Sequence, residues 1–247
     1  MSTPTNLGVP GGVDVLTIGT PRGDFAAHEA RPSGVSRGHV LLIPGFTGSK
    51  EDFTPILPLL AADGWHATAY DQRGQYETVG APDADYSLDG FAADALAVRE
   101  SVAGAAPQSH VVGHSFGGLV AQAAVLESPR TWASLTLLCT GPGGFTIERQ
   151  TKPLGAFIDA VPRLGLAKVF EIQQEKKAPV PPEVLAFLRT RYTANSPDSM
   201  TSIARHLIDA PDRVDELVAL GLPVFVVRGA DDNEWPPQVQ AETAARL

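Results

Sequence analysis

Short, dense apolar runs recur along the first 140 residues of the chain. The densest of them lie at residues 39–43, 65–70, 110–112 and 133–139. Aliphatic and β-branched side chains dominate these runs, which is typical of strands that are buried on both faces of a parallel sheet. Two less apolar runs, residues 13–20 and 25–31, flank a turn and predict an antiparallel hairpin at one edge of that sheet.

Amphipathic stretches separate these runs and predict helices. Residues 88–102 carry apolar side chains at helical spacing, residues 51–62 have a helical pattern, and residues 118–126 form a run of small apolar residues. Strands and helices therefore alternate along the chain. This order predicts the α/β class, with a mostly parallel sheet that is covered by helices on both faces.

The pattern changes after Cys139. Residues 141–212 contain no convincing strand, and their apolar residues fall at helical spacing. Prolines predict that this segment breaks into short helices; they stand at positions 153, 162, 179, 181, 182 and 197. The alternating pattern then resumes as a helix, a strand and a further helix, at residues 214–220, 223–228 and 236–247. We therefore expect an α/β core of residues 1–140 and 213–247, with a helical cap, or lid, of residues 141–212.

Ser115 stands in a Gly-x-Ser-x-Gly segment between a predicted strand and a predicted helix. A sharp strand-to-helix turn leaves almost no room beside the serine, and Gly113 and Gly117 have no Cβ to clash there. Such a turn lifts the hydroxyl off the end of the sheet. It also directs the N–H of Phe116 and the helix N-terminus at the group that the hydroxyl attacks. The segment therefore predicts a nucleophile elbow.

Composition and charge narrow the function classes. The formal net charge of −9 disfavours nucleic acid and anionic membrane surfaces as partners. The single cysteine, Cys139, excludes an internal disulfide, and its place in an apolar run favours a buried apolar role over a catalytic thiol. Without a signal-peptide pattern or a membrane-length apolar run, we expect a cytoplasmic protein. Zinc-ligand and phosphate-loop patterns are absent from the sequence, so we expect no metal and no cofactor.

Four motifs follow one another in the order of a known superfamily, at residues 44–46, 71–74, 113–117 and 229–232. With these motifs the chain resembles a capped α/β-hydrolase over residues 13–247. It is similar in particular to the small serine esterases, the C–C bond hydrolases and the cofactor-free haloperoxidases of that superfamily. This fold hosts many reactions, so the resemblance implies the fold and leaves the substrate open.

The resemblance also implies a role for individual residues. Ser115 would be the nucleophile that forms an acyl-enzyme, and the backbone N–H groups of Phe46 and Phe116 would form the oxyanion hole. The Gly-x-x-Asp spacing of the family selects Asp232 as the acid of the triad, with Asp231 as the alternative. Further residues that would border the substrate are Gly45, Thr47, His114 and Trp235.

The sequence offers no histidine at the position where the family has the general base of the triad. In this family the histidine follows the acid after one more helix and strand. All six histidines of the sequence precede Asp232; they stand at positions 28, 39, 66, 110, 114 and 206. The ring of His114 is expected to point away from the Ser115 hydroxyl, and only His206, in the cap, could reach the site from above. We therefore expect that this sequence lacks the natural C-terminal strand, histidine and helix, and that the catalytic histidine is not present in this chain.

The sequence thus predicts a serine hydrolase that acts on an ester, thioester or related acyl bond of a small to medium apolar substrate. A C–C bond hydrolase or a perhydrolase would use the same triad and stays open. A ligand-binding or receptor-like, catalytically weak member of the fold is the third hypothesis, and the missing histidine favours it. Homo-oligomerisation stays open as well. Arg73 is expected to tie loops together rather than to bind substrate.

Overall fold

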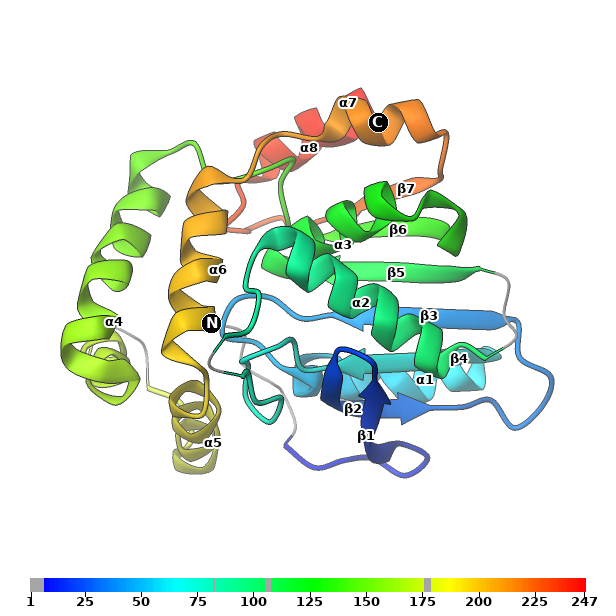
Figure 1. Cartoon of the computed structure of the whole chain (residues 1–247), viewed down its shortest axis with the longest axis horizontal. Coiled ribbons are helices and arrows are strands. Elements are labelled where there is room, and N and C mark those ends of the chain that lie inside the picture. The colour runs from blue at the N-terminus through cyan, green and yellow to red at the C-terminus, as the bar shows by residue number, and fades with distance from the viewer. Residues whose placement is uncertain (1–6, 82, 105–107, 176–178) are drawn as a thin grey trace.

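The computed structural model describes residues 7–81, 83–104, 108–175 and 179–247, in which seven strands form one sheet (Figure 1). The strands are β1 (Asp14–Thr20), β2 (Gly23–Ala30), β3 (Gly38–Ile43), β4 (Trp65–Tyr70), β5 (Ser109–His114), β6 (Trp132–Leu138) and β7 (Val224–Val227). Their order across the sheet is β1-β2-β4-β3-β5-β6-β7. The pairs from β4 to β7 are parallel, whereas β1 and β2 form an antiparallel hairpin that continues antiparallel onto β4. The predicted α/β class and its edge hairpin are confirmed.

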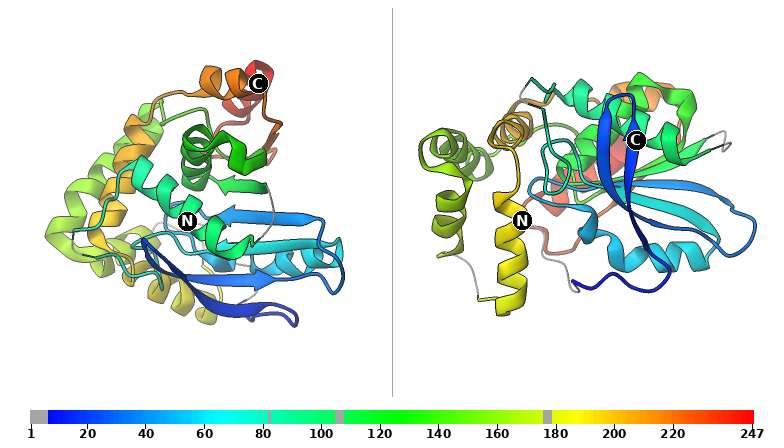
Figure 2. Two further views of the ribbon diagram at one scale, coloured as in Figure 1. Left: turned by 45° about the vertical axis from the view of Figure 1, so that its right-hand side comes forward. Right: turned by 60° about the horizontal axis from the view of Figure 1, so that its bottom comes forward.

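Helices cover both faces of the sheet (Figure 2). Helix α1 (Leu57–Ala62) packs on the face to which Leu42 of β3 belongs. Helices α2 (Leu88–Val102) and α3 (Phe116–Glu127) pack on the opposite face, with Leu41 of the same strand. Alternate side chains of β3 therefore enter different cores, which is why this strand is apolar from Val40 to Ile43. Helix α7 (Val214–Leu220) packs on α3, and α8 (Pro237–Arg246) packs on β7.

Three helices between β6 and β7 lie beside the carboxyl ends of the parallel strands (Figure 1). They are α4 (Glu148–Gln174), α5 (Pro182–Thr193) and α6 (Pro197–Asp209). The prediction that every proline breaks a helix is wrong for α4, which continues through Pro153 and Pro162 and turns sharply at Gly165, where φ is 73°. An apolar stripe that includes Phe157 and Val161 is buried in the core against α6, and this burial outweighs the backbone hydrogen bonds that the prolines remove.

The predicted helix at residues 51–62 is shorter than expected. Residues Lys50–Asp52 and Thr54–Ile56 form two 3₁₀ turns, and the α-helix begins only at Leu57. Pro55 and Pro58 each lie in the first two positions of a turn or helix, where their missing N–H has no intrahelical partner to lose. The prolines thus mark two new helical starts rather than one continuous helix.

Strand β7 forms one edge of the sheet. The side chains of Phe225 and Val227 are 56% and 46% exposed, whereas Val224 and Val226 are half-buried against the core. No described residue pairs with the outer edge of this strand. An apolar strand face therefore lies open to solvent.

A buried polar network crosses the amino ends of the central strands. The ring of His39 is almost fully buried, and its two nitrogens lie 3.1 Å from Ser109 Oγ and 3.1 Å from Thr68 Oγ1. Burial lowers the pKa of His39 to about 3, and the positive charge of Arg99 and the neighbouring ring of His66 act in the same direction. His39 is therefore neutral in the folded protein at neutral pH.

This burial predicts a pH dependence of stability. Because the pKa of His39 is lowered on folding, the unfolded chain binds an extra proton between about pH 6.5 and pH 3. The contribution of neutral, buried His39 to the free energy of unfolding is fully present above the pKa of the unfolded chain. It is lost as the pH falls below that value, by about 1.4 kcal/mol per pH unit. Urea unfolding at pH 7, 6 and 5 should show a smaller pH slope for His39→Gln than for the native chain. Parallel stability curves for the two proteins would contradict this assignment.

Candidate active site

Ser115 occupies the turn between β5 and α3, where its backbone has φ 52° and ψ −119°. A residue with a side chain rarely adopts this conformation, which costs about 1–3 kcal/mol and persists only where the surroundings impose it. Two hydrogen bonds to β6 and its end hold it: the Ser115 N–H donates to the Leu138 carbonyl at 3.0 Å, and Thr140 Oγ1 donates to the Ser115 carbonyl at 2.7 Å. The turn has the geometry that the sequence predicts for a nucleophile elbow.

The glycines around Ser115 allow main chain to pack against main chain. A Cβ at Gly113 would collide with the carbonyl group of Gly117. A Cβ at Gly117 would lie 2.6 Å from the Pro44 carbonyl oxygen and would also collide with the carbonyl group of Ile43. The elbow and the end of β3 therefore touch through their backbones, which only glycine permits at these two positions.

The two predicted oxyanion donors come from different elements. Phe116 is the first residue of α3, so its N–H has no intrahelical partner, and its ring is fully buried at 5.4 Å from the ring of Phe91. Phe46 follows β3, and its half-buried ring meets Phe157 of α4 edge-on at 5.3 Å. A Cβ at Gly45 would lie only 3.0 Å from Ser115 Cβ, so the loop that carries Phe46 lies directly on the elbow.

Two neighbouring cavities share Ser115 and Phe46 in their walls. The first has a volume of about 560 Å³ and is bordered by the predicted residues Gly45, Phe46, His114, Ser115, Asp231, Asp232 and Trp235. The second, of about 390 Å³, extends beneath α4 and includes Thr47 in its wall. Its apolar side chains are Phe46, Phe145, Pro153, Leu154 and Leu207. The structure thus brings the predicted site residues together at one end of the sheet, apart from the ring of Phe116, which lies in the core.

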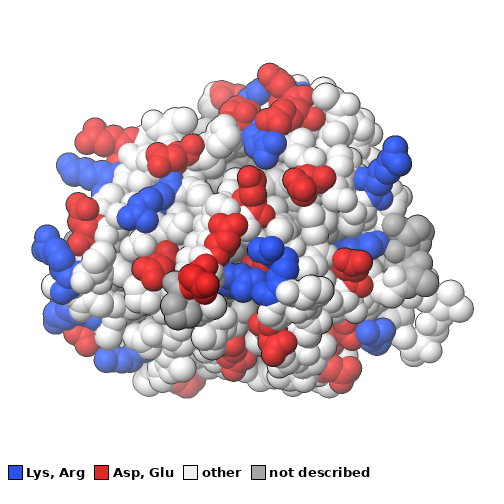
Figure 3. Space-filling view, in the orientation of Figure 1, with Lys and Arg blue, Asp and Glu red and all other residues white. Residues whose placement is uncertain are grey.

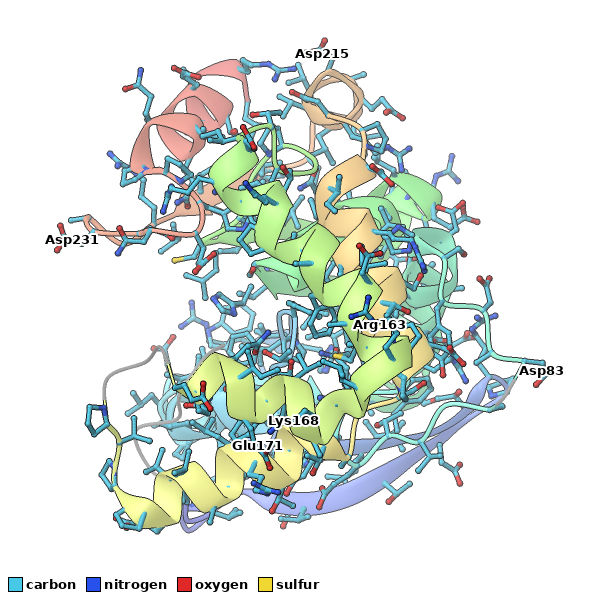
Figure 4. The ribbon with its side chains drawn as sticks, turned by 90° about the vertical axis from the view of Figure 1, so that its left-hand side faces the viewer. Asp83, Arg163, Lys168, Glu171, Asp215 and Asp231 are labelled. Carbon is cyan, nitrogen blue, oxygen red and sulfur yellow. The ribbon has the colours of Figure 1, made fainter. Side chains whose placement is uncertain are left out.

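The two aspartates after β7 differ in their surroundings. Asp232 Oδ1 accepts hydrogen bonds from the N–H groups of Glu234 and Trp235, each at 2.9 Å, and its Oδ2 accepts one from Gln240 Nε2 at 3.0 Å. Asp231 is exposed at the tip of a projecting loop, and its side chain points away from the protein (Figure 4). The geometry favours Asp232 over Asp231 as a group that acts within the cavity.

Cys139 is not the buried apolar residue that the sequence led us to expect. It is partly exposed, has a positive φ of 47°, and lies in the wall of the first cavity with Ser115 and Asp232. Burial raises the pKa of its thiol, and the negative charge of Asp232 raises it further, so the thiol is protonated at neutral pH. The sequence held a sign of this position, because Cys139 directly follows a parallel strand and the carboxyl ends of such strands meet at the site.

Four of the six histidines contact partners outside this cavity. Their ring nitrogens lie 2.6 to 3.1 Å from side-chain oxygens, in the pairs His28–Thr54, His39–Ser109, His66–Glu29 and His110–Ser134. His206 Nε2 lies 2.8 Å from the carbonyl oxygen of Tyr86. His114 borders the first cavity, and burial lowers its pKa, so its ring is neutral at neutral pH. Among the described residues, no histidine is hydrogen-bonded to Ser115 or to Asp232.

The remaining motif residue has the structural role predicted for it. Arg73 forms two hydrogen bonds with the buried carboxylate of Asp94, at 2.7 and 2.6 Å, and a third with the carbonyl oxygen of Arg22 at 2.7 Å. These bonds tie the loop after β4 to α2 and to the turn of the edge hairpin. The Arg73 guanidinium therefore stabilises the loop after β4 and the turn of the edge hairpin.

Acidic and basic side chains are interspersed over the face drawn in Figure 3. Within the described ranges, no three His, Cys, Asp or Glu side chains are grouped so that they could hold a metal ion. The helices described here are all too short or too polar to cross a lipid bilayer.

Comparison with known proteins identifies the fold family. A family model for the alpha/beta hydrolase fold matches residues 38–160, which include the loop after β3, the elbow and β6. The chain belongs to the α/β-hydrolase superfamily. Over this segment the order of strands and helices, with the Ser115 turn between β5 and α3, is the one that the sequence predicts.

This α/β-hydrolase is similar to proteins that are named for hydrolytic reactions. It is 39% identical over 99 residues to RutD of Variovorax paradoxus (strain S110), named as a candidate carbamate hydrolase; the match covers 40% of this chain and 36% of RutD. It is 28% identical over 237 residues to Lipase 3 of Moraxella sp. (strain TA144), covering 92% and 72% of the two chains. The enol-lactonase of Burkholderia xenovorans LB400 aligns with a TM-score of 0.76 at 17% identity, over 94% of this chain and 87% of the lactonase. At that identity the structural likeness concerns the fold alone.

Proposed function

We propose that this α/β-hydrolase is a serine hydrolase that cleaves an ester or a related acyl bond of a small to medium apolar substrate. Ser115 Oγ attacks the acyl carbon, and the carbonyl oxygen becomes an oxyanion that the N–H groups of Phe46 and Phe116 stabilise. Collapse of this intermediate expels the alcohol, which takes up the proton that the Ser115 hydroxyl released to a base, and leaves the acyl group on Ser115. Water then attacks the acyl-enzyme and releases the acid.

The conformation of Ser115 is the observation that carries the proposal. A serine with φ 52° and ψ −119° lies where two cavities meet, and the loop that holds Phe46 packs against it. Strain of this kind concentrates at functional sites, because the surrounding structure must supply the energy that maintains it. Two cavities that share Ser115 in their walls suit a bond whose acyl half and leaving group occupy different cavities.

The apolar side chains in the wall of the cavity beneath α4 support an apolar substrate. Phe145, Leu154 and Leu207 present apolar surface in the cavity beneath α4, whose wall also contains polar side chains such as Arg149 and Gln150. Transfer of an apolar chain from water to the apolar part of this wall is favourable. Helices α4 to α6 would then act as the cap that encloses the substrate. The name of Lipase 3 agrees with an ester as the bond that is cleaved.

Asp232 is proposed as the acid of the triad, and its role is to orient and stabilise an imidazolium. Its two oxygens are held by Glu234, Trp235 and Gln240, which fixes the carboxylate beside the cavity. Since no described histidine is hydrogen-bonded to Asp232, the base is the open part of this proposal. That same observation favours a second candidate, a ligand-binding protein of this fold in which turnover is slow.

Covalent labelling separates the two candidates. A fluorophosphonate reacts with an activated serine in an α/β-hydrolase, and peptide mass spectrometry identifies the modified residue. We expect the adduct on Ser115, and we expect free imidazole to accelerate its formation by at least about tenfold, because the imidazole accepts the proton of the hydroxyl. Labelling rates with and without imidazole measure this effect.

Matched aspartate variants test the proposed acid in the same experiment. Asp232→Asn should remove most of the acceleration by imidazole, because the amide no longer stabilises the cation, whereas Asp231→Asn should retain it. Equal behaviour of the two variants would contradict the role of Asp232. Absence of an adduct on Ser115 under both conditions would overturn the hydrolase proposal in favour of ligand binding.

A further inference from the structure

Two glutamines after β4 reach the loop that carries Phe46. Gln72 and Gln75 are buried, with side chains no more than 1% exposed. Gln75 Nε2 donates to the Gly45 carbonyl oxygen at 3.1 Å, and Gln72 Nε2 donates to the Pro44 carbonyl oxygen at 2.8 Å. Gln72 Nε2 also donates to Gln75 Oε1 at 3.1 Å, which fixes the orientation of the Gln75 amide.

The carbonyl oxygen that Gln75 contacts belongs to the same peptide group as the Phe46 N–H. This oxygen also accepts a hydrogen bond from the Gly48 N–H at 3.0 Å. A trans peptide is planar, and its C=O and N–H point in opposite directions. Two donors that hold the Gly45 oxygen on the buried side therefore direct the Phe46 N–H to the opposite side, where Phe46 and Ser115 border the same cavities.

The Phe46 N–H is also unengaged within the described part of the chain, where no residue accepts a hydrogen bond from it. Hydrogen bonds to a carbonyl oxygen polarise the peptide and make its N–H a stronger donor. The buried glutamine thus acts on both the direction and the strength of this donor. We propose that Gln75 is a positioning residue for the oxyanion hole, acting through the Gly45–Phe46 peptide; this inference rests on the proposed hydrolase function.

A substitution at Gln75 should leave the fold intact. Gly45 O keeps the Gly48 N–H as a partner when the Gln75 amide is removed, so no carbonyl oxygen is left wholly unsatisfied. Gln75→Met preserves the length and volume of the side chain and removes its donor. The matched control is Gln122→Met, because Gln122 is likewise buried and its Nε2 donates to the Gly141 carbonyl oxygen at 3.0 Å.

Kinetics of the full chain in imidazole buffer provide the first test. For hydrolysis of p-nitrophenyl butyrate, Gln75→Met should lower kcat by about 10- to 100-fold, somewhat less than the loss of an oxyanion donor, and should change KM less than about twofold. Gln122→Met should retain kcat within about twofold, at a comparable loss of thermal stability. Equal loss of kcat in the two variants, or a change in KM alone, would overturn the proposal.

A second measurement does not depend on turnover. Labelling with ¹³C-carbonyl glycine and ¹⁵N-phenylalanine selects three Gly–Phe peptides of this sequence, at residues 45–46, 90–91 and 144–145. In Gln75→Met one of the three amide signals, that of Phe46, should shift and exchange its proton at a different rate, while the other two stay in place. Three unchanged signals would refute the role of Gln75. If the signal of Phe46 shifts but Ser115 is never labelled by the fluorophosphonate, the hydrolase proposal fails and the contact of Gln75 with the loop stands.

Discussion

Replacing Ser115 by alanine should lower the hydrolysis of a short p-nitrophenyl ester by at least about 100-fold in imidazole buffer. The substitution removes the oxygen atom that is proposed to form the acyl-enzyme and leaves the proposed backbone donors in place. Where a complete triad acts as a unit, loss of the nucleophile costs about 10⁶ in kcat. The smaller loss expected here reflects the weaker action of a free imidazole, which is not held in place beside the serine.

Initial rates at several ester concentrations measure this effect. Ser101→Ala, at an exposed serine of α2, is the control and should hydrolyse the ester at the native rate. The Ser115→Ala variant should also fail to bind the fluorophosphonate covalently while retaining near-native thermal stability, because alanine keeps the Cβ and loses only the hydroxyl group. A Ser115→Ala protein with the native rate of hydrolysis would show that the activity arises elsewhere.

Gly117→Ala should lower the free energy of unfolding by about 3 kcal/mol or more. The added Cβ would lie 2.6 Å from the Pro44 carbonyl oxygen, and both colliding carbonyl groups are main-chain atoms at the end of β3. Relief of the collision must move α3 away from the loop that carries Phe46. The two oxyanion donors would then separate, so ester hydrolysis should fall together with stability. Urea unfolding and initial rates on the same samples measure both effects.

The control for Gly117→Ala is the same substitution in an open position. A Cβ at Gly155, inside α4, meets no atom within 4 Å. Because alanine has the higher helix propensity, Gly155→Ala should raise the free energy of unfolding by about 0.5–1 kcal/mol. If crowding is the cause, the free energy of unfolding should fall in Gly117→Ala and rise in Gly155→Ala. Destabilisation of similar size at both positions would show that glycine is needed there for another reason.

Local patterns in the sequence predict much of the fold and part of the site. The apolar runs locate the strands, and the glycines on either side of Ser115 predict the elbow, because a tight turn requires residues without a Cβ at those positions. The Gly-x-x-Asp spacing selects Asp232, and the surroundings of the two aspartates favour the same residue. The roles of Ser115, Asp232, Phe46 and Phe116 in catalysis stay predictions until the variants are measured.

The less accurate expectations concern residues whose environment is decided by distant segments. Pro153 and Pro162 should end a helix in isolation, but the backbone stays helical through both prolines, where α4 packs against α6, and leaves the helical conformation only at Gly165. Cys139 has an apolar neighbourhood in the sequence, and yet the ends of neighbouring strands place it in the wall of a cavity with Asp232. In both cases side chains from elsewhere in the chain outweigh the local preference.

The sequence by itself determined the order of strands and helices, the parallel core and the elbow, because these follow from hydrophobic period and from backbone sterics within a few residues. Only the tertiary structure decided which buried groups hold the site. Gln75 and Gly45 are 30 positions apart, and the hydrogen bond between them depends on the pairing of β3 with β4. Contacts of that range leave no local pattern, since they arise from where the folded sheet places the ends of its strands.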